Sequence, residues 1–173
     1  GNIRAAGSTL RWISGVFGIS SEEAAEIAAQ SKSDGVCLVP AFNGLGAPWW
    51  DSRALGLISG LTLNTDKGAL FAAAVESIAH QVADVVDAMN ASGVEVQRLL
   101  LDGGPSRNAK LREMLSAYIA KPVVHCSDAE LSALGVAHLA GVGAGIWDWD
   151  AIAKLQRAQT ATDVSERNAA TKP

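Results

Sequence analysis

The sequence has 173 residues, of which 49% are apolar, 18% are charged and only 5% are aromatic, which is typical of one globular domain and excludes disorder as the dominant state. Lys and Arg number 14 against 18 Asp and Glu, so the formal net charge is -4. Because no basic run is present, neither a nucleic-acid binder nor a protein that binds anionic membranes is indicated.

The cysteines and the apolar stretches indicate the cellular compartment. Cys37 and Cys126 are far apart and form no CxxC or Cys/His cluster, which favours a reducing cytoplasm over a disulfide scaffold or a zinc site. The apolar stretch Leu131 to Trp147 is shorter than the roughly 20 residues of a membrane span, so we expect a buried helix there. No signal peptide is visible and the chain opens on Gly1 without Met, as expected for a cytoplasmic piece of a longer protein.

The first half of the chain predicts two helices and two strands. Apolar spacing predicts a helix from Ala5 to Phe17, and the capping box of Ser20 and Glu23 predicts a second helix to about Gln30 with a solvated polar face. The segments that follow are a short buried strand at 35–40, a loop rich in Gly and Trp at 41–51, and a second strand at 55–63.

A long amphipathic helix is the clearest element. Asn64 and Thr65 are expected to cap it, and it should end between Asn90 and Gly93. Its apolar residues step by three or four positions along one predicted face: Phe71, Val75, Ile78, Val82, Val85 and Met89.

Strands and helices continue to alternate in the second half. The predicted elements are a strand at 96–101, a helix over 111–119, a strand at 122–125, a capping box at Ser127 and Glu130, a helix from Leu131 to about Ala144 and a short helix at 150–156. This alternation predicts an α/β domain with a partly parallel sheet covered by helices. Residues 1–157 are expected to form the domain, and residues 158–173 a polar, frayed tail.

The turn Asp102-Gly103-Gly104 after a predicted strand is the first candidate site. Glycine lets a ligand touch the backbone, and a helix starting between Pro105 and Asn108 would offer free amides. Asn108, placed one turn into that helix, could reach the edge of a heterocycle. Spacing alone favours the alternative, an ordinary turn between a strand and a helix.

The loop from Ala41 to Asp51 is the second candidate. Adjacent Trp49 and Trp50 are costly to leave exposed, so we expect them to pack on the core of this domain, on a neighbouring domain or on a ligand, with packing favoured over a ligand platform. Asn43-Gly44 is consistent with a simple turn.

Other chemistry-bearing residues give weaker signals. His80, His125 and His138 form no metal or nucleophile constellation and are expected to be satisfied or surface side chains. Asp51 and Asp102 lie in loops without an acid/base partner, and Asp102 is expected to accept amide hydrogen bonds within its turn. The sequence contains no GxxxxGK[ST], HExxH or GxSxG motif.

Five segments in register carry a family resemblance: 39–51, 57–62, 76–79, 101–108 and 132–141. Over about four fifths of its length, from Ala5 to Trp147, the chain resembles the carboxy-terminal half of the FGGY carbohydrate kinases. The Gly-Leu-Gly-Ala-Pro-aromatic-Trp-Asp run is more similar to the glycerol kinases than to the xylulose kinases. The resemblance implies an α/β, ribonuclease H-like (actin-like ATPase) domain with a mixed sheet flanked by helices, facing a second domain across a cleft.

The resemblance also implies a set of nucleotide-binding residues. Gly104 and Asn108 correspond to residues that line the adenine pocket of the family, with Gly103 beside them, and Gly7 corresponds to the glycine that begins the first helix. Where the glycerol kinases carry Gln, this sequence has Arg11, whose guanidinium only donates hydrogen bonds and could favour a phosphate or displace the usual contact.

By the same resemblance, this chain is the ATP-binding half of a kinase that phosphorylates glycerol or a similar polyol, with Mg²⁺ as the working metal. The catalytic Asp, the first phosphate-binding loop and most polyol contacts belong to the amino-terminal half of the same polypeptide in this family. We therefore expect binding without catalysis here, and no catalytic or metal residues. Gly135 is expected to allow close helix contact near the hinge between the domains. The alternatives are a kinase for another sugar such as xylulose, or a non-catalytic nucleotide-binding module; a homo-oligomer is compatible with each.

Overall fold

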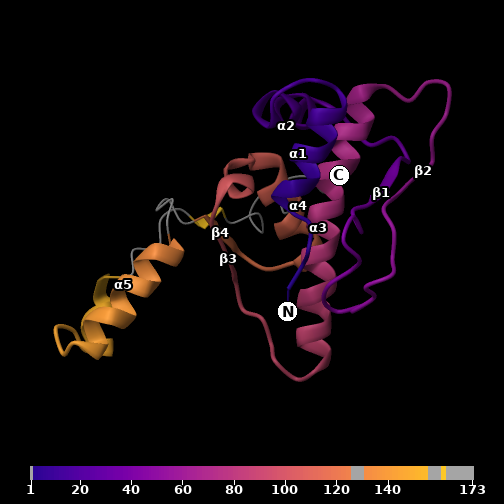
Figure 1. Ribbon diagram of the computed structural model, residues 1–173. Helices are drawn as coiled ribbons and strands as arrows, with labels where there is room; N and C mark the ends of the chain where they lie inside the picture. Colours follow the sequence, from indigo (N-terminus) through magenta and orange to yellow (C-terminus); the bar gives the residue numbers. More distant parts are fainter. Residues whose placement is uncertain (1, 126–130, 156–160, 163–173) are drawn as a thin grey trace, which may run out of the picture.

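The computed structural model describes residues 2–125, 131–155 and 161–162 (Figure 1). The helices are α1 (Gly7–Val16), α2 (Ser21–Gln30), α3 (Lys67–Ala91), α4 (Ala109–Ile119), α5 (Leu131–Gly143) and α6 (Trp149–Leu155), with a 3₁₀ turn η1 (Gly104–Arg107) before α4. The strands are β1 (Cys37–Val39), β2 (Leu57–Ser59), β3 (Leu99–Leu101), β4 (Val123–His125) and β5 (Ala161–Thr162). Every predicted helix and strand within the described residues is present, with ends shifted by a few positions.

Two small sheets confirm the mixed pairing. β1 and β2 form an antiparallel ribbon with Leu38 opposite Ile58. In the second sheet β4 is central, parallel to β3 and antiparallel to β5. β5 uses two residues of the predicted tail, whereas the boundary between domain and tail stays a prediction.

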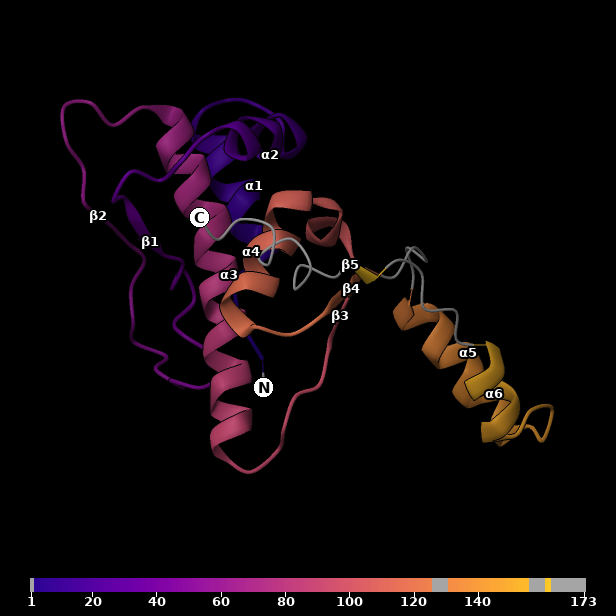
Figure 2. The same ribbon diagram turned by 180° about the vertical axis from the view of Figure 1, so that it is seen from behind.

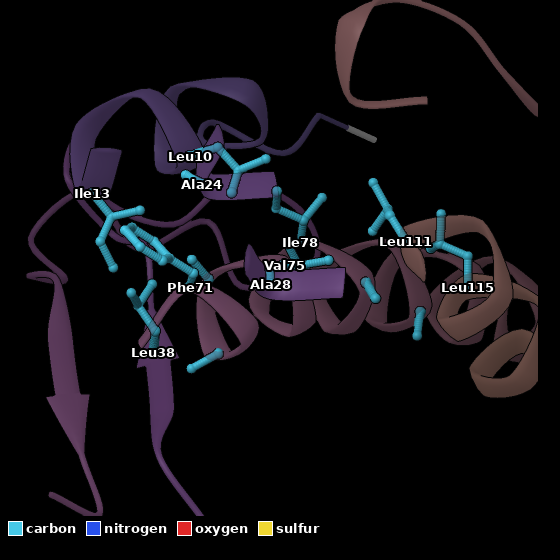
Figure 3. Packing of buried hydrophobic residues seen from close by; sticks show 14 of the residues in the cluster. Leu10, Ile13, Ala24, Ala28, Leu38, Phe71, Val75, Ile78, Leu111 and Leu115 are labelled. Atoms are coloured by element: carbon cyan, nitrogen blue, oxygen red, sulfur yellow. The ribbon is translucent and has the colours of Figure 1, made fainter. Parts of the chain in front are cut away.

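Helix α3 forms the centre of the core, and α1, α2, α4 and β1 pack around it (Figure 3). Phe71, Val75 and Ile78 are at most 3% exposed, as the apolar spacing predicted, whereas Met89 at the far end is 39% exposed. By length and composition α3 could cross a membrane, but 61% of its apolar window is buried within the domain, which accounts for its hydropathy.

The helix caps confirm one prediction and correct another. The Ser20 hydroxyl accepts a hydrogen bond from the Glu23 amide at 3.0 Å and opens α2 as expected. The cap of α3 is Asp66, whose Oδ1 accepts from the Ala69 amide at 2.8 Å, so the prediction of Asn64 and Thr65 was wrong. Thr65 instead accepts from the Thr62 amide at 2.9 Å and closes the turn before the helix.

Strand β1 is less buried than predicted. Only Leu38 is buried, because a two-stranded ribbon leaves Cys37 and Val39 facing solvent.

Helix α5 is the larger correction, because it is exposed rather than buried. Val136 is 67% and Leu139 59% exposed, and both views show α5 and α6 projecting away from the helices around α3 (Figure 2). A Cβ on Gly135 would meet no atom within 4 Å, so the described residues make no close contact with this glycine. Gly141 on the same helix lies directly against the Trp147 ring. The capping box at Ser127 and Glu130 lies outside the described residues.

The core of the domain depends on Phe71, which is 0% exposed, packs under α1 and meets the Phe17 ring edge-on at 5.2 Å. We expect Phe71→Ala to lower the free energy of unfolding by about 3–5 kcal/mol, because it removes buried area and leaves a cavity. Leu63→Ala is the control, since Leu63 is 106% exposed and its truncation should stay within about 0.5 kcal/mol. Urea unfolding measures both; similar losses for the two variants would contradict this view of the core.

Candidate functional site

A pocket of about 610 Å³ opens where α1, α2 and the turn after β3 meet. Four of the predicted site residues line it together, although they come from distant parts of the sequence: Gly7, Arg11, Gly104 and Asn108. The remaining lining residues are Leu10, Ser21, Glu22, Ala25, Glu26, Ala29, Arg107 and Ala109. The fold therefore brings the start of the first helix and the Asp-Gly-Gly turn to one cavity.

The turn after β3 is held by its own polar contacts. The buried Ser106 donates its hydroxyl hydrogen to the Gly103 carbonyl at 2.6 Å, and Arg112 Nη1 donates to the Ser106 carbonyl at 2.7 Å. Gly103 has a φ of +85°, where a side chain would be strained, and its amide donates to Asp102 Oδ1 as predicted. Gly103 is not among the lining residues, so its role beyond the turn stays a prediction.

Gly104 presents bare backbone to the pocket. A Cβ built on it meets no atom within 4 Å, and its backbone is not left-handed, so the glycine is not required by packing or by φ. A flat ligand could therefore approach this backbone closely.

Asn108 is the N-cap of α4, and not a residue one turn into the helix as predicted, because η1 takes up the intervening residues. Its Oδ1 accepts a hydrogen bond from the Leu111 amide at 3.0 Å. Within the described part of the chain its Nδ2 donates to no acceptor, so this half-buried amide group keeps two N–H donors for a ligand.

The start of α1 favours an anion. Ala6 caps the helix without a side-chain hydrogen bond, and its carbonyl accepts from the Thr9 amide at 2.9 Å. Within the part of the chain that the structure describes, the Gly7 and Ser8 amides have no such acceptor and are open to solvent or a ligand. The partial positive charge of a helix N-terminus attracts anions, and the exposed Arg11 side chain one turn later adds a full charge.

Helix α2 forms one wall of the pocket, and the sequence did not predict its residues as part of the site. Glu22 and Glu26, four residues apart, are exposed and border the pocket, and Ala25 and Ala29 line it with them. The pattern predicted a solvated polar face, which is correct, but the position of α2 opposite η1 comes from packing on α3 and leaves no local signal. Arg107 was missed for the same reason.

The tryptophan loop lies outside this pocket. Trp49 and Trp50 are each 63% exposed, so they do not pack on the core of this domain, the first of the three expected partners. Trp49 Nε1 donates a hydrogen bond to Asp84 Oδ2 at 3.2 Å, which fixes the loop against α3. Asp51 Oδ1 accepts from the Arg53 amide at 2.8 Å and serves the turn.

The histidines lie in separate surroundings. The His80 ring stacks on Tyr118 with centroids 4.5 Å apart, and His138 meets the edge of Trp147 at 5.6 Å. Burial, and then the charge of Glu76, raise the pKa of Tyr118. Across residues 2–125, 131–155 and 161–162, no three His, Cys, Asp or Glu side chains gather to hold a metal ion.

Comparison with known proteins shows where this domain belongs. Residues 1–144 match the model of the FGGY family of carbohydrate kinases, C-terminal domain. The chain belongs to the FGGY family of carbohydrate kinases. As an FGGY carboxy-terminal domain it has the ribonuclease H-like, actin-like ATPase fold that the resemblance implied.

Individual relatives agree with this assignment. A glycerol kinase of Streptococcus pyogenes serotype M6 is 42% identical over 160 residues, covering 90% of this chain and 32% of that protein. The crystal structure of Plasmodium falciparum glycerol kinase with ADP matches at a TM-score of 0.79 and 32% identity, covering 99% of this chain and 36% of the other. The crystal structure of a xylulose kinase from Rhodospirillum rubrum matches at a TM-score of 0.74 and 26% identity, covering 92% of this chain and 33% of the other. The FGGY domain thus spans about a third of the length of these relatives.

Asn108 can be tested first for its structural role. Asn108→Ala should lower the free energy of unfolding by about 1 kcal/mol, because the Leu111 amide loses its cap. Asn108→Asp keeps a capping oxygen in the same place and should unfold close to the parent chain. Thermal or urea unfolding of the two variants measures this. An equal loss of unfolding free energy in both would show that the capping oxygen does not stabilise α4.

Proposed function

We propose that this chain is the ATP-binding half of a kinase that transfers the γ-phosphate of ATP to a hydroxyl of glycerol or a similar polyol. The supporting observation is the pocket that joins Gly7, Arg11, Gly104 and Asn108, the residues assigned to nucleotide by resemblance. Membership in the FGGY family and similarity to a glycerol kinase with ADP support the same ligand.

The chemistry of the lining suggests how a nucleotide would lie. The apolar Leu10, Ala25 and Ala29 offer a surface for a heterocycle, which would also rest on the Gly104 backbone and accept a hydrogen bond from Asn108 Nδ2. The phosphates would extend toward the start of α1, where the free amides at Gly7 and the Arg11 guanidinium favour negative charge. Gly103 would act through the shape of the turn.

Turnover requires the amino-terminal half of the same polypeptide. Phosphoryl transfer depends on positioning and charge stabilisation around an in-line attack, so one side of a cleft alone should be inactive. We assign no catalytic residue to this chain. By the family resemblance, Mg²⁺ would be bound between the two domains of the full-length enzyme together with the nucleotide phosphates. We place the enzyme in the cytoplasm; self-association is compatible with this role.

A kinase for another sugar is the second candidate. It is favoured by the match to a xylulose kinase at a TM-score of 0.74 over 92% of this chain. The polyol contacts lie outside the pocket described here, so only phosphorylation assays of the full-length protein with glycerol, other polyols and ketopentoses distinguish the two candidates.

The nucleotide pocket is tested by calorimetric titration of Mg-ADP into the 173-residue chain. Gly104→Leu should weaken binding by about tenfold or more, because the added side chain enters open pocket space without disturbing the fold. Asn108→Asp keeps the helix cap but exchanges two donors for an acceptor, and should also weaken binding by about tenfold.

Gly143→Leu is the matched control for the Gly104 variant, because Gly143 also has open space around it and lies on α5 outside the pocket. Its binding should equal that of the parent chain. Unchanged binding in the Gly104 and Asn108 variants would exclude this pocket as the nucleotide site.

Arg11 is predicted to act on the phosphates. Arg11→Gln should weaken ADP by about tenfold and leave adenosine unchanged, because a charge-assisted hydrogen bond to phosphate becomes a neutral one. Arg53→Gln, at an exposed position outside the pocket, should change neither ligand. The same titrations measure this, and an equal loss for ADP and adenosine would place Arg11 near the base instead.

A further inference from the structure

The loop from Ala41 to Gly56 carries several large apolar side chains that are exposed to water. At its outer end Trp49 and Trp50 are each 63% exposed. At its base an apolar groove of about 570 Å³ is lined by residues that include Trp12, Phe42, Leu55 and Leu57. We call these six side chains the aromatic loop surface. Apolar surface concentrated in this way marks an interaction site.

Hydrogen bonds and close backbone contacts define the shape of the loop, so this exposure is part of the fold. The Leu45 amide donates to the Asp51 carbonyl at 2.7 Å, and the Trp50 amide donates to the Gly46 carbonyl at 2.8 Å. Trp49 is tied to Asp84 on α3. Gly44 lies so close to the backbone of Asp51 and Ser52 that a Cβ would not fit. Such a loop keeps its indoles in place before any partner arrives.

Trp50 also adopts a backbone conformation that opposes its own side chain. Its φ is +52°, in the left-handed region that bulky residues rarely occupy. Local strain of this kind persists where surrounding contacts enforce it, and it concentrates at functional positions. An indole that is 63% exposed contributes little to the packing of this domain, so its main contribution is expected from outside.

The chain enters the domain beside this loop. The Ala47 amide donates to the Asn2 carbonyl at 2.8 Å, and Arg4 Nη1 donates to the Asn43 carbonyl at 2.7 Å. Gly46 leaves no room for a Cβ against the Asn2 carbonyl. Polypeptide attached upstream of Asn2 therefore emerges next to the aromatic loop, and the glycerol kinase relative is about three times as long as the matched segment. Attachment at this point gives an upstream domain a high effective concentration at the surface.

We propose that the aromatic loop surface is the docking face for the amino-terminal half of the same polypeptide; this rests on the proposed function, which requires that half. Exposed indoles suit this role because Trp residues anchor interfaces through large, rigid contact areas. A second copy of the chain or a small ligand could also bind exposed indoles. The position of Asn2 beside the loop favours the amino-terminal half over both, because only that half is covalently attached at this point.

The test compares the full-length protein with the 173-residue chain, both labelled with 5-fluorotryptophan. A soluble nitroxide broadens the fluorine resonances of exposed indoles. Trp49 and Trp50 should be broadened in the chain and protected in the full-length protein at every protein concentration, without added ligand. Trp50→Ala should return Trp49 to the broadened state in the full-length protein. The control Trp149→Ala should leave Trp49 protected, because Trp149 has nearly the same exposure, 62%, but lies on α6.

Three outcomes would overturn the proposal. Broadened Trp49 and Trp50 in the full-length protein would show that nothing docks there. Protection that grows with the concentration of the isolated chain would assign the surface to a second copy. Protection that requires polyol or Mg-ADP would assign it to a ligand.

Phosphorylation of polyol by ATP, measured on the same full-length sample, separates this inference from the proposed function. Phosphorylation with exposed tryptophans would overturn the docking face alone. Protected tryptophans without phosphorylation of any polyol or sugar would keep the docking face and overturn the function.

Discussion

Burial of the apolar face of α3 is the interaction on which the rest of the domain depends. α1, α2, α4 and β1 all pack against this one helix, while the two sheets contribute only short strands. Phe71, Val75 and Ile78 are removed from water almost completely, and each such side chain contributes about 1.5–3 kcal/mol. Local propensity could not hold the short surrounding helices in place, because helices of ten residues are marginal in water without tertiary contacts.

The pocket is a consequence of this packing. α1 and α2 lie on one stretch of α3 and α4 on another, so the start of α1 and the cap of α4 face each other across the groove between them. Leu10 is the one buried residue among those that line the pocket, and α2 is attached to the core through Ala24 and Ala28 on its other side. The site is therefore positioned by buried contacts and remains accessible, which suits a ligand that must enter and leave.

The sequence predicted the elements well because their signals are local. The stripe of α3, the Ser20 cap and the Asp-Gly-Gly turn each depend on neighbours within a few residues. The Thr65 hydroxyl accepts from the Thr62 amide in the preceding turn, and Asp66 caps α3 instead. The spacing of residues in the sequence does not show which side-chain oxygen is used in the turn. Four of the five predicted site residues meet in the pocket. The family resemblance, and not the spacing in the sequence, predicted that they belong to one site. Glu22 and Arg107 were missed, since their proximity to the site arises only when α2 and η1 pack around α3.

The failed prediction for α5 and the exposed tryptophans have one physical cause. An apolar sequence predicts that a side chain will be buried, but it does not say whether the covering surface belongs to the same domain. A chain of this size buries only about 70% of its unfolded surface, so a domain with one helical core has few places for a second apolar helix and a loop with two indoles. Val136, Leu139 and Trp50 are therefore surplus to the core around α3. The pocket proposed for the nucleotide, in contrast, is lined by α1, α2, η1 and the start of α4. The proposed ligand site thus lies within the part that the core positions, whereas the apolar side chains left over by the core are those assigned to the proposed docking face.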